Sequence, residues 1–194
     1  MATATSAGRP RDPRIDEAVL AATRELLVEV GYTQLSYERI AQRAGATRPA
    51  MYRRWPSKAH LVHDAVFPVG ATELVPDGGS FADDLRQMVH RTLASYARPE
   101  ARVAVPGLLA DLDDPERRRN VVDGLQDQVR AQLADRVARA VAAGEVRPAV
   151  DADVLLDTVV GALIHRVVAR RSLDPAFGDQ LTDLLLGGLR PSER

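Results

Sequence analysis

Residues 31 to 58 read GYTQLSYERIAQRAGATRPAMYRRWPSK. Ser36 is a good N-cap for the apolar residues that follow at helical spacing, which predicts a short helix over 36–44. The Ala44-Gly45-Ala46 run predicts a tight turn, and a second short helix is expected over 47–54. Two short helices joined by a glycine-containing turn can present the second helix to a DNA groove, provided that a further helix braces them.

Helices are expected on both sides of this motif. Pro13 suits the opening turn of a helix over 13–30, and Gly31 should stop that helix. A fourth helix is expected over 58–67. We therefore predict a helix-turn-helix DNA-binding domain over residues 13–67.

The rest of the chain is also predicted to be helical, because apolar residues recur at helical intervals and alternating strand-like runs are missing. The expected fold class is all-α, with an N-terminal three-helix helix-turn-helix domain and a C-terminal helical ligand-binding and dimerisation domain. Residues 1–12 are expected to be a disordered arm, and 68–194 a helical regulatory and dimerisation domain that begins with a loop over 68–80. Its helices are expected over 81–97, 100–111, 115–143, 151–171 and 175–188, with Ser80 and Asp151 among the residues that precede them.

Charge is divided unevenly along the sequence. The formal net charge is -1, from 26 basic and 27 acidic residues. Residues 1–67 hold ten of the basic and seven of the acidic groups, a net +3, which leaves -4 for the remainder. A basic N-terminal part on an acidic body favours contact of that part alone with a polyanion such as double-stranded DNA.

Several classes of function are disfavoured by residues that the sequence lacks. Without cysteine, a disulfide framework and a thiolate metal site are excluded, and a cytoplasmic location is expected. The four histidines are scattered, so surface histidines are favoured over metal ligands, and no metal or cofactor is expected. Phosphate-binding glycine loops, nucleophile elbows and paired-histidine motifs are missing, which argues against an enzyme. We also expect no signal peptide and no membrane partner.

A helical wheel separates two faces of the segment 47–54. Met51 and Trp55 are four residues apart and should bury against the preceding helices. The opposite face is formed by Pro49, Ala50 and Arg53 and is expected to be exposed. Tyr52 and Arg54 are expected on the flanks and Arg48 at the N-terminal end, with Thr47 as the N-cap.

The exposed residues of this motif have side chains suited to duplex DNA. Arg48 and Arg53 can place forked donors on guanine O6 and N7, and Ala50 is small enough to pack on a thymine methyl group. Other hydroxyls and cations are expected to contact phosphates. The predicted DNA-contacting set is Ser36, Tyr37, Thr47, Arg48, Pro49, Ala50, Tyr52, Arg53, Arg54 and Lys58.

The run over 31–58 closely resembles the N-terminal signature of the tetracycline-repressor (TetR) family of transcriptional regulators. It has the Gly-aromatic pair, the Ile-Ala of the second helix, the Ala-Gly turn, the tyrosine of the recognition helix and the lysine that opens the fourth helix. This resemblance implies that Tyr52 and Lys58 contact phosphate, and that the chain is a homodimer on a near-palindromic operator. Trp55 stands where phenylalanine is more usual, and should alter packing rather than function. The resemblance also implies a repressor that a small-molecule effector releases.

A dimer needs an interface, and the last two predicted helices are the best candidates for it. Gly161 and Ala162 would permit close helix approach. The alternative is that their apolar residues form the core of one subunit. The candidate interface set is Val154, Leu155, Thr158, Val159, Ala162, Leu163, Val167, Phe177, Leu181, Leu184 and Leu185.

An effector pocket is only faintly indicated, because apolar residues at helical spacing are more often plain core. With 4% aromatic residues, a moderately apolar, flexible molecule is favoured over a flat one. Two alternatives to a ligand-responsive repressor stay open: an effector-independent or architectural DNA-binding protein, and a helical enzyme. The candidate lining residues are Met88, Tyr96, Leu108, Leu109, Leu125, Val129 and His165.

Overall fold

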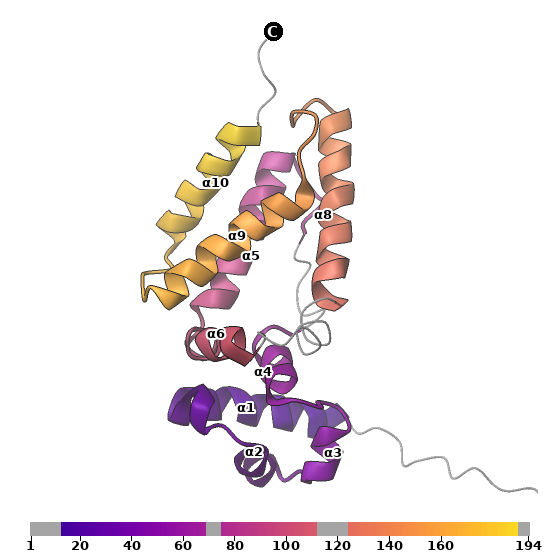
Figure 1. Ribbon diagram of the computed structural model, residues 1–194. Coiled ribbons are helices and arrows are strands. Elements are labelled where there is room, and N and C mark those ends of the chain that lie inside the picture. Colours follow the sequence, from indigo (N-terminus) through magenta and orange to yellow (C-terminus); the bar gives the residue numbers. More distant parts are fainter. Residues whose placement is uncertain (1–12, 69–74, 112–123, 190–194) are drawn as a thin grey trace, which may run out of the picture.

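The computed structural model describes residues 13–68, 75–111 and 124–189, and all regular secondary structure in these ranges is α-helical (Figure 1). The all-α fold class is therefore confirmed. The helices are α1 (Pro13–Gln34), α2 (Tyr37–Ala44), α3 (Arg48–Tyr52), α4 (Lys58–Val66), α5 (Phe81–Ala97), α6 (Pro99–Asp111), α8 (Gly124–Ala142), α9 (Ala152–Val168) and α10 (Pro175–Leu189).

Side-chain hydrogen bonds fix several helix starts where the sequence predicts them. Ser36, Ser80 and Asp151 each accept a hydrogen bond from the first turn of the following helix. Thr47 is the N-cap of α3, but its side chain makes no capping hydrogen bond, so the predicted capping by its hydroxyl is wrong. Pro49, the second residue of α3, has no N–H, which removes one of the two amides from which a capping oxygen can accept.

Glycine shapes the chain at two points in the motif. Gly31 has φ 78° and ψ 168°, so the regular part of α1 ends there as predicted, although one further helical turn continues to Gln34. Gly45 has φ 62° and ends α2 in the left-handed region, where a residue with a Cβ is strained. These two bends set the directions in which α2 and α3 leave α1.

Two hydrophobic cores hold the chain together, and we call the parts around them the head (residues 13–68) and the body (75–111 and 124–189). The head core includes the fully buried Leu27 and Ile40, and the body core includes Val89 and Leu163. Phe67, at the end of α4, packs against both cores. The head and body are therefore in continuous apolar contact.

α6 lies beyond the predicted domain boundary at residue 68 and yet packs against the head. This helix lies across α1, between the head and the upright helices of the body (Figure 1). Ala101, Ala104 and Leu108 of α6 are buried in the head core. The small alanines let α6 approach α1 closely, so a helix that the sequence assigns to the regulatory domain completes the core of the head.

A buried ion pair fixes α5 against α8. Arg136 Nε lies 2.7 Å from Asp84 Oδ2, and both side chains are nearly inaccessible. Arg136 also donates to the carbonyl oxygen of Gly79 at 3.3 Å, and Asp84 accepts from the backbone of Gly78. These bonds satisfy groups that would otherwise be costly to bury.

Some predicted segments differ from the structure or lie outside the described residues. α9 ends at Val168 rather than 171, because Arg170 has φ 53° and the chain turns there. α3 ends at Tyr52 rather than 54, and the amide of Arg54 bonds to the carbonyl oxygen of Met51, three residues earlier, in a turn. The predicted arm over 1–12, part of the loop over 68–80 and the part of the 115–143 helix before Gly124 lie outside the described residues.

Candidate nucleic-acid interface

The two short helices of the motif lie on the side of α1 that faces away from the body (Figure 1). Met51 and Trp55 are 1% and 5% exposed, which confirms that they bury against the preceding helices. Pro49 and Arg53 are exposed, and Ala50 is half-buried. The outward orientation predicted for this face of α3 is therefore observed.

Arg48 and Arg53 provide the cationic part of this outer face. Both are exposed, and within the described ranges neither guanidinium forms a hydrogen bond or an ion pair. A guanidinium without a protein partner keeps its full set of donors for an external acceptor. Guanidinium donors are suited to the edge of guanine, and the contact of these two side chains with bases stays a prediction.

Arg54 is placed differently from its predicted role as a phosphate contact. Its guanidinium pairs with Asp16 of α1, and both side chains are largely buried. This pair connects the residues just beyond the end of α3 to α1. The structure therefore gives Arg54 a structural contact, which argues against a role on the DNA-contacting surface.

Lys58 and Ser36 each have hydrogen-bond donors left that could bind a phosphate. Lys58 Nζ donates to the carbonyl oxygen of Tyr32 at 3.3 Å and lies 4.2 Å from the centroid of the Tyr32 ring. An ammonium group has three protons, so this hydrogen bond leaves others available. The Ser36 hydroxyl accepts the capping bond and can still donate.

Tyr37 does not have the exposure expected of a phosphate contact. It is 9% exposed, and its hydroxyl donates to the carbonyl oxygen of Trp55 at 2.6 Å. Burial raises the pKa of this phenol, with a further contribution from Tyr52. Tyr37 belongs to the head core, and its low exposure argues against a direct contact with DNA. The pattern of α2 contains the signal, since Tyr37 is three and four residues before the inward Ile40 and Ala41.

The carboxylate of Asp64, on α4, holds Trp55 just beyond the end of α3. Trp55 Nε1 donates to Asp64 Oδ2 at 2.9 Å. His60 Nε2 and His63 Nδ1 lie 3.6 Å and 3.8 Å from the oxygens of the same carboxylate. Burial raises the pKa of Asp64, but bonds from His63 and Trp55 and the nearby His60 outweigh it and leave the pKa below its ordinary value.

The head is joined to α6 by a polar contact that sequence reasoning missed. The Tyr32 hydroxyl donates to Asp111 Oδ2 at 2.5 Å. A Cβ on Gly107 would lie 2.9 Å from Tyr32 Cβ and closer still to the ring, so only glycine fits at this crossing. No local pattern in the sequence pairs Tyr32 with residues so far along the chain.

The structure divides the candidate dimer residues into two groups. Leu155, Val159, Leu163, Val167 and Leu181 are buried in the body core, so the alternative interpretation as core is correct for these five. Val154 and Leu184 are 62% and 74% exposed, and Thr158 is also exposed. The remaining members are partly buried: Ala162, Phe177 and Leu185.

The candidate pocket residues do not meet in one cavity. Met88 lines a cavity of about 10 Å³ beside the Asp84–Arg136 pair, and Val129 is body core. Tyr96 packs against Phe67 with ring centroids 5.0 Å apart, and Leu108 lies in the head core. These four side chains thus lie in different parts of the two cores, and an effector pocket stays a prediction.

The other three candidate pocket residues do not lie in such a cavity either. Leu109 and His165 are exposed, and the side chain of Leu125 lies outside the described residues. The physical reason for the error is that α6 turns its apolar face to the head, while periodicity alone does not say which core a helix joins.

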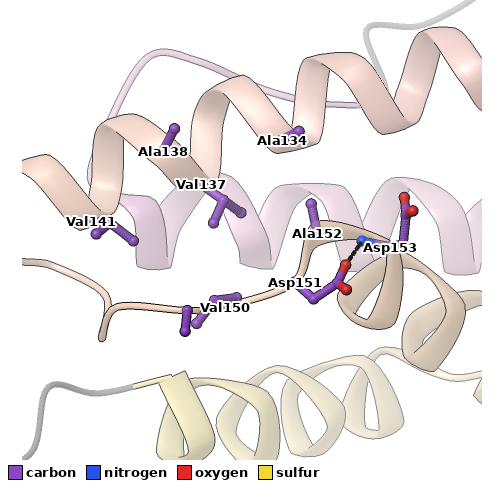
Figure 2. A pocket seen from close by; sticks show the side chains of 9 residues that line it. Ala134, Val137, Ala138, Val141, Val150, Asp151, Ala152 and Asp153 are labelled. Atoms are coloured by element: carbon purple, nitrogen blue, oxygen red, sulfur yellow. Dashed lines mark hydrogen bonds between the residues drawn. The ribbon is translucent and has the colours of Figure 1, made fainter.

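A larger hollow lies between α8 and the start of α9 (Figure 2). Its volume is about 510 Å³, and it is an open groove rather than an enclosed cavity. Small apolar side chains of α8, including Val137 and Val141, form one wall, and Val150 and Asp151 lie opposite (Figure 2). Sequence reasoning missed this groove because alanine and valine at helical spacing carry no distinctive signal.

Two other kinds of site are missing from the described ranges. No helix there is both long enough and apolar enough to cross a membrane. No group of three or more histidine, aspartate or glutamate side chains in these ranges could hold a metal ion. The two short helices α2 and α3, joined through the Gly45 turn and packed on α1, have the geometry of a helix-turn-helix.

Comparison with known proteins identifies the family. Residues 19–65 match the family described as bacterial regulatory proteins, tetR family, and residues 75–185 match the tetracyclin repressor-like C-terminal domain. The DNA-binding transcriptional repressor TetR of Mycobacteroides abscessus is 32% identical over 192 residues, which cover 91% of this chain and 95% of the relative. The chain belongs to the TetR family of helix-turn-helix transcriptional regulators, whose members are typically repressors.

Solved structures agree with this assignment. The TetR family transcription regulator SCO0332 is 32% identical, has a TM-score of 0.67, and the match covers 92% of this chain and 100% of that one. FadR of Bacillus subtilis, solved in complex with stearoyl-CoA, has a TM-score of 0.68 at 14% identity over 90% and 99% of the two chains. The second similarity concerns the fold alone. The family is one of regulators that bind DNA as dimers, and it is not a family of enzymes.

Proposed function

We propose that the chain is a homodimeric repressor that reads a near-palindromic operator through α3 and acts in the cytoplasm without catalytic activity. The observation that carries this proposal is the outer face of α3, where Arg48 and Arg53 are exposed while Met51 and Trp55 bury the opposite side. Arg48, Pro49, Ala50 and Arg53 face the major groove in this proposal. Ser36, Thr47, Tyr52 and Lys58 contact the flanking phosphates.

The dimer is proposed to form through the exposed face of α9 and α10. Val154, Thr158 and Ala162 follow one another along α9 at four-residue intervals, and Val168 continues the exposed apolar residues toward the end of that helix. Leu184 on α10 is the most exposed large apolar side chain of the described residues. A second copy that covers this face would place two recognition helices about 34 Å apart, one turn of DNA.

An effector that releases the DNA is proposed to be a moderately apolar, flexible small molecule. FadR, which has the same fold, was solved with stearoyl-CoA. One observation favours the alternative, an effector-independent DNA-binding protein. The cavity beside the Asp84–Arg136 pair is only about 10 Å³, and the larger hollow of about 510 Å³ is an open groove, whereas a ligand site typically buries most of the ligand surface.

One experiment tests the function and separates these alternatives. The full chain is used to select duplexes from a random-sequence pool, and the selected duplex is then titrated with metabolite extracts. Enrichment of a two-fold symmetric sequence supports the proposal, and failure to enrich any sequence refutes it. Release by an extract supports effector control, whereas no release by any extract favours the effector-independent protein.

A further inference from the structure

The two tyrosines at the edge of the head core form a stacked pair. The rings of Tyr37 on α2 and Tyr52 on α3 have centroids 4.2 Å apart and planes 13° from parallel. Tyr37 is 9% exposed and Tyr52 is 51% exposed, so one ring belongs to the core and the other rests on it. The pair therefore connects the interior of the head directly to the outer face of α3.

Tyr37 is held in place independently of this stack. Its hydroxyl donates to the carbonyl oxygen of Trp55, just beyond the end of α3. Trp55 is in turn fixed to α4 through Asp64. Tyr37 thus touches the recognition segment at two points, through its ring at Tyr52 and through its hydroxyl at Trp55.

Tyr52, unlike Tyr37, is exposed. Within the described ranges its hydroxyl has no hydrogen-bond partner, so it is available to an external acceptor. An exposed side chain normally samples several rotamers, and binding must then restrict it to one. A ring already stacked on a buried neighbour loses less freedom when its hydroxyl is fixed.

We propose that Tyr37 is a positioning residue for DNA binding, which holds the Tyr52 phenol in the orientation that a backbone phosphate requires. The inference rests on the proposed function, because it assigns Tyr52 to a phosphate. Tyr37 itself does not touch DNA. Its contribution passes through the Tyr52 hydroxyl, and it lowers the cost of forming that contact.

The test is a double-mutant cycle in the full chain, with DNA affinity measured by fluorescence anisotropy on a duplex that the wild-type protein selects from a random pool. Tyr37→Leu removes the platform, Tyr37→Phe keeps the ring, and Tyr52→Phe removes the hydroxyl that the platform positions. We expect Tyr37→Leu to weaken binding by about tenfold in the wild-type background, a loss comparable to one charge-assisted hydrogen bond. In the Tyr52→Phe background the same change should cost less than about twofold, because neighbouring effects that share one contact are not additive.

The control is Tyr37→Phe, which keeps the stack and should bind within about threefold of wild type. A general loosening of the head would instead weaken binding equally with and without the Tyr52 hydroxyl. Equal losses in both backgrounds, or a Tyr37→Phe protein as weak as Tyr37→Leu, would overturn the proposal.

A second measurement does not depend on DNA or on the folding of a variant. In the DNA-free wild-type protein, the Tyr52 ring protons should be shifted upfield by the Tyr37 ring in NMR spectra. Resonances at free-tyrosine positions would overturn the proposal. If the wild-type protein selects no duplex although the shift is present, the proposed function fails, and with it the role of the stack in DNA binding.

Discussion

At the scale of single residues, the exposed arginines of α3 differ in expected effect from the lysine at the start of α4. Arg48→Ala or Arg53→Ala should cost about 1 to 3 kcal/mol of binding free energy and relax the preference at particular base pairs. Lys58→Ala should weaken all sequences alike and reduce the salt slope by about 1, because it removes a phosphate contact.

The matched control for these changes is Arg86→Ala, which removes one positive charge from a surface ion pair on α5, in the body. It should bind DNA as the wild type does. The measurement is affinity for the selected duplex and for single-base variants at several salt concentrations. Equal, sequence-independent losses for Arg48, Arg53 and Lys58 would contradict the assignment of bases to the two arginines.

Trp55 is expected to contribute more to stability than any exposed residue of the motif. Trp55→Ala should lower the free energy of unfolding by about 3 to 5 kcal/mol, because it removes a large buried aromatic side chain. Trp55→Phe keeps most of the apolar contact and loses the bond to Asp64, so it should cost about 1 kcal/mol. Urea unfolding measures both, and an unchanged midpoint for Trp55→Ala would contradict its burial.

Asp64 makes the stability of the head depend on pH in the acidic range. Its pKa in the folded chain lies below the ordinary value of 3.8, so the carboxylate stabilises the fold above that value, and this stabilisation is lost as the pH falls through the lower folded pKa. The wild type should therefore be more stable than Asp64→Asn at neutral pH, and the difference should shrink below pH 3.8. Urea midpoints across this range measure it, and a constant difference would contradict the hydrogen-bonded carboxylate.

At the scale of helices, the crossing of α6 over α1 depends on the absence of a side chain at residue 107. Gly107→Ala would place a Cβ against Tyr32, so we expect α6 to move away from the head and the melting temperature to fall. Gly78→Ala, before α5 and outside the proposed interface, is the control, because its Cβ would have no atom within 4 Å, and its melting temperature should be equal or slightly higher. A Gly107→Ala protein that melts like the control would contradict the close approach.

The same scale shows what local sequence patterns can predict. Ser36 and Gly45 predict the two ends of α2, because a serine caps a helix start and a glycine adopts the left-handed conformation at a helix end. The spacing of Met51 and Trp55 predicts the orientation of α3. Both kinds of signal act within one helix. The contacts of Tyr37 with Tyr52 and of Arg54 with Asp16 were not predicted, since they join different helices. Periodicity also does not distinguish residues that face their own core from those that face a partner.

At the scale of the whole molecule, the exposed face of α9 and α10 should determine the oligomeric state. Leu184→Glu places a charge in the centre of the proposed interface, so we expect a monomer with much weaker DNA binding. Leu109→Glu, at an exposed leucine of α6, is the control and should stay dimeric. Sedimentation equilibrium distinguishes them, and a dimeric Leu184→Glu protein would exclude this face as the interface.

The most direct test of DNA recognition by this chain is an experimental structure of the full chain bound to its selected duplex. We expect two copies with their α3 helices in successive major grooves on one side of the DNA, and with Arg48 and Arg53 within hydrogen-bonding distance of base edges. A complex in which α3 lies away from the grooves, or in which those arginines face only solvent or protein, would contradict the account.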